Sequence, residues 1–223
     1  MELTREIYWN IGHGAGTLVP MYAFTFAAIA VFVWGFLQRI KVYRLGQSLD
    51  RTDNLGARIA GLIKDVLLQT KVVVVKGPGV AHALFFWGFF LLFIGTCLIV
   101  LQADFTDLFF GIKFLKGPFY LLFSLVLDMA GLVAIVMLAG LFVRRYLVRP
   151  EGLETKKDDA IMHGLLFAIL ITGFLIEGAR MAVTELGTPL ALWSPVGLIV
   201  AKAMSAIGEA SLRSLHVGLW WFH

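Results

Sequence analysis

The chain has 223 residues, of which 59% are hydrophobic and 15% are charged, and its mean hydropathy is +0.85. A water-soluble domain of this size cannot cover so much apolar surface, so a lipid bilayer is the expected solvent. The net charge of +4 is small and scattered and gives no indication of nucleic-acid binding. The single cysteine, Cys97, excludes a disulfide framework and a cysteine-ligated cluster held by this chain alone.

Five apolar segments predict an all-α membrane protein, a bundle of five transmembrane helices. Four of them, residues 17–37, 78–103, 118–143 and 160–183, are long enough to cross a hydrocarbon core of about 30 Å. The fifth, residues 214–223, has ten residues and reaches only half of that thickness. We therefore expect the fifth helix to be truncated and residues 1–223 to be one transmembrane domain that is incomplete at its C-terminus.

The connections between these segments differ in charge. Residues 38–77 hold eight of the 19 basic residues, and residues 144–159 hold five. The positive-inside rule then predicts a multi-pass protein of the cell inner membrane with its N-terminus outside. The basic 38–77 loop, with helix-like spacing over residues 55–68, can dock a soluble partner or follow anionic membrane lipid headgroups.

One further apolar stretch, residues 186–201, has 16 residues and contains Pro189 and Pro195. Its length and its prolines predict a segment at the outer membrane face, interfacial or re-entrant, in place of a span. If this stretch did cross the bilayer, a six-span model would follow and the last helix would run the other way.

All the histidines lie within or at the ends of the apolar segments. An ionisable side chain in lipid is costly, so each calls for a functional role or a named partner. Neutral imidazole is a good ligand of heme iron, and two histidines from facing helices can clamp a heme in a bundle. Hydrogen bonding between helices is an equally good explanation at this point. The five histidines are His13, His82, His163, His216 and His223.

The predicted orientation sorts the histidines by depth. His82 and His163 lie near the cytoplasmic face, and the other three lie in the outer half. These two layers match what two stacked hemes need. His216 and His223 are seven residues apart, which places them on one helix face about 10 Å apart in height, too far to ligate the same iron.

Three phrases carry a family resemblance. They are Ala81-His82-Ala83-Leu84-Phe85-Phe86-Trp87-Gly88, Trp220-Trp221-Phe222-His223 and Arg5-Glu6-Ile7-Tyr8-Trp9-Asn10-Ile11-Gly12-His13. With the five-span arrangement they resemble cytochrome b subunits of the nitrate reductase gamma type. The similarity is greatest to the N-terminal membrane domain of heterodisulfide-reductase-related (Fe-S)-binding oxidoreductases, and it covers essentially the whole chain.

The resemblance implies the electron-transfer component of a quinone-linked oxidoreductase. Such a module carries two b-type hemes and passes electrons between a quinone pool, here menaquinone, and iron-sulfur clusters. The clusters belong to a cytoplasmic iron-sulfur protein or to a fused domain, which this chain does not include. In this family each heme is held by one histidine of the second span and one of the fifth.

Two positions match the family ligands, and two do not. His82 matches the first ligand of the second span, and His223 matches the first ligand of the fifth. The second ligand of the second span would stand ten residues beyond His82, where this chain has Leu92. The inner heme is therefore expected to have His82, with its partner missing or replaced by His163.

The outer heme is expected to use His223, with His13 or His216 in place of the absent ligand. His13 is preferred because it comes from a different helix. The predicted iron ligands are thus His82, His223 and His13.

Two acidic positions complete the candidates. Asp128 lies ten residues into the third span, where the cost of an acid in lipid predicts a proton relay for quinone chemistry or a hydrogen-bond partner of a heme ligand. A plain hydrogen bond between helices is equally expected. Glu177 and Arg180, three residues apart on one helix, predict an ion pair near the outer surface. The alternative function is a non-heme transporter or anchor subunit, in which the histidines relay protons or pack helices.

Overall fold

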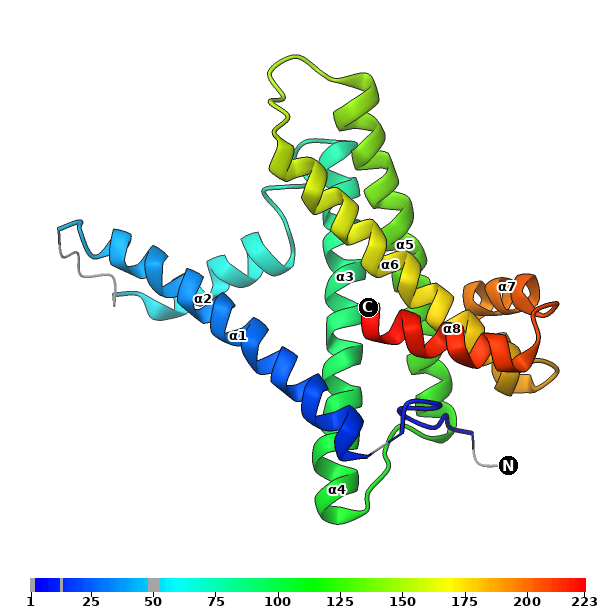
Figure 1. Ribbon diagram of the computed structural model, residues 1–223. Coiled ribbons are helices and arrows are strands. Elements are labelled where there is room, and N and C mark those ends of the chain that lie inside the picture. Colours follow the sequence, from blue (N-terminus) through cyan, green and yellow to red (C-terminus); the bar gives the residue numbers. More distant parts are fainter. Residues whose placement is uncertain (1–2, 13, 48–52) are drawn as a thin grey trace. The chain divides into compact units, whose positions relative to one another are not determined.

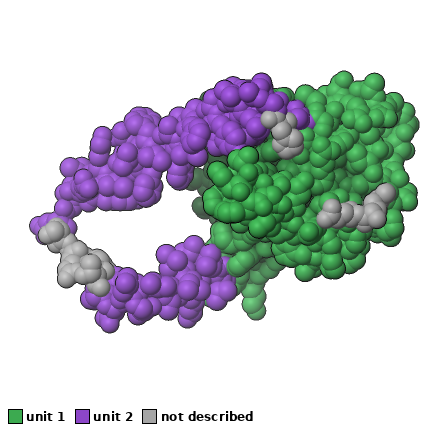
Figure 2. All heavy atoms as spheres, turned by 90° about the horizontal axis from the view of Figure 1, so that it is seen from below, with its two compact units in different colours: residues 1–10, 69–223 green, residues 11–68 purple. Residues whose placement is uncertain are grey.

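The computed structural model describes residues 3–12, 14–47 and 53–223, so His13 lies outside the described residues. Within these ranges every regular element is a helix or helical turn, which confirms the all-α class. The chain divides into two compact units, Ile11–Leu68 and Met1–Asn10 with Gln69–His223, coloured separately in Figure 2. Each unit is described by itself.

The unit Ile11–Leu68 contains two helices. α1, Ala15–Tyr43, has 29 residues and extends the predicted first span at both ends. None of its residues is buried, although apolar side chains cover it on all sides, a pattern typical of a helix that faces lipid. α2, Leu55–Leu62, continues into a π-helical turn, Ile63–Leu67, and confirms the helix predicted over residues 55–68.

The larger unit is built on three long helices, drawn in green to yellow in Figure 1. Proline in the first turn of the first two suits the helix start, where the missing N–H has no intrahelical partner. These helices are α3, Pro78–Val100; α5, Gly117–Phe142; and α6, Lys157–Thr184. A π-helical turn, Leu101–Thr106, joins α3 to the short α4, Asp107–Phe110, and another, Val143–Val148, follows α5.

In the part of the chain that the structure describes, four helical segments are long and apolar enough to cross a membrane, which is compatible with a multi-pass membrane protein. They are Ala15–Tyr43, Pro78–Phe110, Gly117–Val148 and Lys157–Thr184. The fifth predicted span corresponds to α8, Glu209–Phe222, which begins five residues before the predicted start. It has only 14 residues and is not among the four, so a count of five spans is not confirmed.

The stretch predicted at the outer face forms two short elements. A 3₁₀ turn, Pro189–Trp193, leads into α7, Pro195–Met204, which packs against α5 and α6. With ten residues, α7 is too short to cross a bilayer. Its approach to α6 depends on Gly178, where an added Cβ would lie 2.4 Å from the side chain of Val200.

Small residues also bring α3 and α5 together, and the two lie side by side in Figure 1. A Cβ at Gly88 would stand 2.7 Å from the Ala130 carbonyl oxygen, so only glycine allows this approach. Between α5 and α6 the core consists of Ala134, Leu138 and Leu170, all buried.

The N-terminal residues 3–10 form an irregular strap on the larger unit, with turns at residues 7–10. The Thr4 hydroxyl donates to the Leu115 carbonyl at 2.7 Å, just before α5. At the other end, the Asn10 side-chain amide donates to the Arg213 carbonyl of α8 at 2.8 Å. The strap is therefore fixed between the beginning of α5 and the last helix.

Candidate functional site

A cavity of about 570 Å³ lies within the larger unit. Its walls come from the N-terminal strap, α3, α5, α6 and α8, and most of the lining side chains are apolar. This volume falls in the range of small-molecule and cofactor sites, about 300–1,000 Å³. The charged and imidazole side chains that line it are Arg5, Glu6, Asp128, Glu177, Arg180, His216 and His223.

His223 is held against α6 by a hydrogen bond between its ring and the side chain of Thr172. The two side chains meet with the Nδ1 atom 2.9 Å from the Thr172 Oγ1 atom. That hydroxyl also lies 2.6 Å from the Ala168 carbonyl, to which it donates its only proton. The hydroxyl must then accept from His223, so the Nδ1 atom carries the proton. The Nε2 atom is left with its lone pair, the form in which imidazole binds a metal.

His216 lines the same cavity and is 3% exposed. Its Nδ1 atom is buried and has no hydrogen-bond partner within the described residues. The Trp9 ring packs edge-on against the imidazole with centroids 4.8 Å apart. A buried polar atom without a partner costs about 1–3 kcal/mol, so this nitrogen points to a group that the cavity receives.

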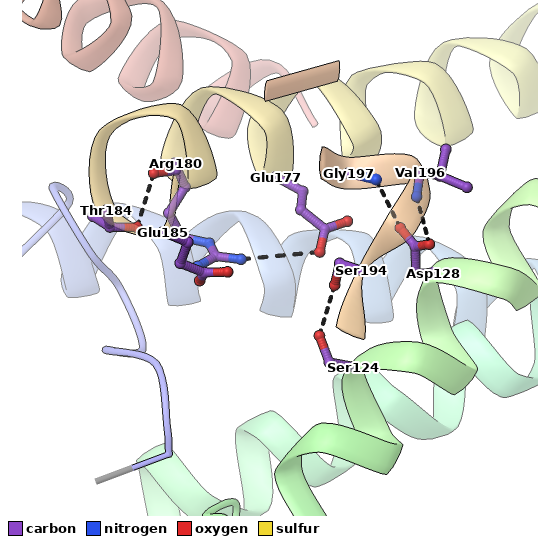
Figure 3. A network of polar contacts seen from close by, with 9 residues as sticks. All are labelled: Ser124, Asp128, Glu177, Arg180, Thr184, Glu185, Ser194, Val196 and Gly197. Carbon is purple, nitrogen blue, oxygen red and sulfur yellow. Dashed lines mark hydrogen bonds and ion pairs between the residues drawn. The ribbon is translucent and has the colours of Figure 1, made fainter. Parts of the chain in front are cut away.

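Arg180 is the centre of a buried polar network near the end of α6 (Figure 3). Its guanidinium lies 3.9 Å from the Glu177 carboxylate, which confirms the predicted ion pair. A second, closer pair joins it to Glu185, which follows the end of α6. Sequence reasoning missed Glu185 because helical spacing does not apply beyond the last turn. The network is also more buried than a pair near the outer surface would be.

Asp128 holds the beginning of α7 (Figure 3). Its two carboxylate oxygens accept hydrogen bonds from the backbone N–H groups of Val196 and Gly197, each at 2.9 Å. A carboxylate is favourable there because the first N–H groups of a helix have no intrahelical partner. The hydrogen bond between helices is therefore found. The proton relay stays a prediction, with Asp128 at the cavity wall.

His82 lies in a different environment, a second cavity of about 290 Å³. Apart from His82 itself, five phenylalanines and Leu166 line it. Phe89 and Phe93 line both cavities, so the two share a wall. The His82 side chain is exposed, in contrast to buried His216.

His163 lines neither of these cavities. Its Nδ1 atom lies 2.7 Å from the Asp159 carbonyl one turn earlier, and its ring packs edge-on against Phe142 and Tyr146. The structure thus does not bring His163 and His82 into one cavity. Across the described residues, no three or more His, Cys, Asp or Glu side chains form a group that could hold a metal ion.

Sequence reasoning gave no role to the strap residues that cover the larger cavity. Besides Trp9, Tyr8 packs edge-on against Trp220 of α8, with ring centroids 6.3 Å apart. The Arg213 guanidinium lies 5.0 Å from the centre of the Trp9 ring, within cation–π range. The sequence signal was the Tyr8-Trp9 pair, which follows the charged Arg5 and Glu6 by a few residues, and nothing local indicates that it folds back onto the last helix.

Two proteins of known name are similar to nearly all of this chain. One is the "EtfAB:quinone oxidoreductase" of Syntrophomonas wolfei, 31% identical over 212 residues, which are 91% of this chain and 29% of that protein. The other is the "Probable iron-sulfur-binding oxidoreductase FadF" of Bacillus subtilis, 23% identical over 197 residues, 88% of this chain and 27% of that protein. No family model and no solved structure matches.

The chain spans less than a third of the length of these curated relatives. Both are named as oxidoreductases, one for quinone and one for iron-sulfur binding. Over about nine tenths of its length, the chain is therefore related to one part of proteins of this oxidoreductase kind.

Proposed function

We propose that this chain is the membrane module of a quinone-linked oxidoreductase, a b-type cytochrome that passes electrons between menaquinone and iron-sulfur clusters. The names of the two relatives support the quinone and the iron-sulfur partner. The observation that carries the heme is the large apolar cavity lined by His216 and His223, with one nitrogen of each left for a ligand.

The residues around the larger cavity fit heme b. Bound there, heme iron would carry one electron at a time. His223 is the first proposed ligand, because Thr172 fixes its proton on the Nδ1 atom and leaves Nε2 for the metal. His13 is the proposed second ligand. His216, about 10 Å away along α8, is the alternative second ligand. If His13 is the ligand, His216 contacts the edge of the heme.

The smaller cavity is the proposed site of a second heme, with His82 as its ligand. Its phenylalanine walls suit a flat aromatic ring. The partner of His82 is open, since His163 bonds to its own helix. Because Phe89 and Phe93 line both cavities, groups bound in them would share a wall, as electron transfer between them requires.

The remaining features are proposed to serve orientation and protons. The basic 38–77 and 144–159 segments would face the cytoplasm of a cell with the protein in its inner membrane, and the N-terminus would lie outside. The iron-sulfur partner would then meet the basic side. Asp128 is the proposed proton relay for the quinone, although α7 occupies both of its oxygens.

The absorption of the purified protein, reduced minus oxidised, tests this proposal. We expect the α band of a b-type cytochrome and two hemes per chain by pyridine hemochrome assay. His223→Ala and His82→Ala should each remove about one heme. His163→Ala should leave both, and loss of the His82 heme in this variant would instead make the two residues partners. A colourless protein would overturn the proposal in favour of a non-heme transporter or anchor.

A further inference from the structure

Arg5 is a cation without a partner at the wall of the larger cavity. It is half-buried in the strap, and the structure gives its guanidinium neither a hydrogen bond nor an ion pair among the described residues. Burial lowers the pKa of Arg5, the nearby Arg180 guanidinium lowers it further, and Glu177 and Glu185 offset this only in part. A charge kept in such a place without a counter-ion destabilises the protein unless something else binds it.

The acids near Arg5 are already engaged. Arg180 holds Glu177 at 3.9 Å and Glu185 more closely, so both carboxylates face another guanidinium. Glu6 lines the cavity too, but its side chain is exposed and the structure records no ion pair between it and Arg5. The Arg5 guanidinium is therefore left without a paired carboxylate among the described residues.

The backbone keeps Arg5 in this position. The neighbouring Thr4 is tied to the residue before α5, and Trp9 packs on His216 at the other end of the strap. The open guanidinium is thus presented by a fixed segment. His216, 3% exposed with an unpartnered Nδ1 atom, is an independent sign that the same cavity receives a ligand.

We propose that Arg5 binds the anionic oxygen group, a carboxylate or phosphate, of an amphiphilic ligand whose apolar body fills this cavity. The planar guanidinium matches such a group with two parallel hydrogen bonds. Most of the cavity wall is apolar, so it suits the body of the ligand and leaves Arg5 to orient it.

For heme, this inference rests on the proposed function, and the anionic group is a propionate of the macrocycle. A fatty acid or phospholipid offers the same chemistry with a different body. Titrations with a porphyrin carboxylate and with a lipid carboxylate distinguish these two ligands.

The test compares the purified protein with Arg5→Gln, which keeps a polar side chain but shortens it and removes the charge and the guanidinium group. Arg58→Gln is the matched control, because Arg58 is exposed and pairs with Asp53 away from the cavity. Heme-depleted protein is titrated with heme b and with its dimethyl ester, in which both carboxylates are blocked. Wild type and Arg58→Gln should bind heme b about tenfold more tightly than the ester, and Arg5→Gln should lose that preference.

If Arg5→Gln prefers heme b over the ester as strongly as wild type does, Arg5 does not bind the carboxylate. The heme proposal would then stay intact. If no heme binds to wild type, the proposed function fails, and the same variants are titrated with oleate and oleyl alcohol. Preference for oleate in wild type that is lost in Arg5→Gln would then assign the site to a lipid anion. No preference in wild type would overturn the anion site as well.

Discussion

The two cavities share a wall but differ in how the protein prepares them. Around the larger one, two of the polar groups have partners in the protein: Thr172 orients His223, and Asp128 holds α7 in place. Around the smaller one, His82 stands among phenylalanines and contributes the only polar side chain of the lining. A single histidine in an apolar site depends on the ligand itself for its orientation. A histidine bonded to a second side chain is oriented before the ligand arrives.

The two cavities therefore depend on different parts of the fold. The larger cavity depends on contacts between segments far apart in the chain, including the strap and α8. The smaller is lined by α3 and by Leu166 of α6, and the close approach of α3 to α5 places its main wall. Mutations that weaken α7 should therefore damage the larger cavity first, and mutations between α3 and α5 should damage the smaller.

The largest effect is expected from Asp128→Ala. It leaves the N–H groups of Val196 and Gly197 without acceptors and removes a negative charge from the N-terminus of α7, at a cost of about 3 kcal/mol. The midpoint of thermal unfolding in detergent, followed by circular dichroism, should fall clearly. Asp107→Ala is the control, because Asp107 makes only a surface ion pair at 3.7 Å.

Asp128→Asn separates the packing role from a proton relay. Asparagine keeps one acceptor but turns an amide group toward a backbone N–H, so it should also lower the unfolding midpoint, though less than alanine. An unchanged midpoint together with lost quinone activity would favour the relay and contradict the packing role.

Gly88→Ala tests the smaller cavity through its supporting helix contact. The added Cβ would lie 2.7 Å from the Ala130 carbonyl oxygen and 3.2 Å from the Ala134 Cβ, so α3 must move away from α5. We expect a loss of about 1–3 kcal/mol in unfolding free energy and a weaker His82 site.

The matched control for Gly88→Ala is Gly140→Ala on α5, where nothing lies within 4 Å of the added Cβ. Alanine favours a helix more than glycine does, so this variant should be neutral or slightly stabilised. If both variants behave alike in detergent melting, the close approach of α3 and α5 is not what supports this region.

Much of the fold could be predicted from local patterns. The four long helices follow from uninterrupted apolar runs, and prolines and glycines mark where α3 and α5 begin. The Glu177–Arg180 pair follows from spacing within one helix. Such features depend on neighbours in the chain, which a sequence displays directly.

The candidate site was harder to predict because its groups meet across long sequence separations. Thr172 and His223 are 51 residues apart, and Asp128 reaches an amide 68 residues later. No periodicity indicates that Arg5 and Trp9 lie at a cavity formed by α6 and α8. The histidines were identified by the cost of placing them in lipid, but which nitrogen faces a ligand depends on a partner that only the fold supplies.

The smallest effect is expected from Thr172→Val, which keeps the shape of the side chain and removes its oxygen. His223 then loses the Thr172 acceptor of its Nδ1 proton and keeps its contact with the backbone of Ile169. The expected cost is about 1 kcal/mol or less, so the protein should fold and bind heme. A ligand histidine without this acceptor donates less electron density to the metal, which should raise the heme midpoint potential slightly. Thr172→Ser, which keeps the hydroxyl, should restore the wild-type value. A potential that is identical in all three proteins would mean that Thr172 packs against His223 without orienting it.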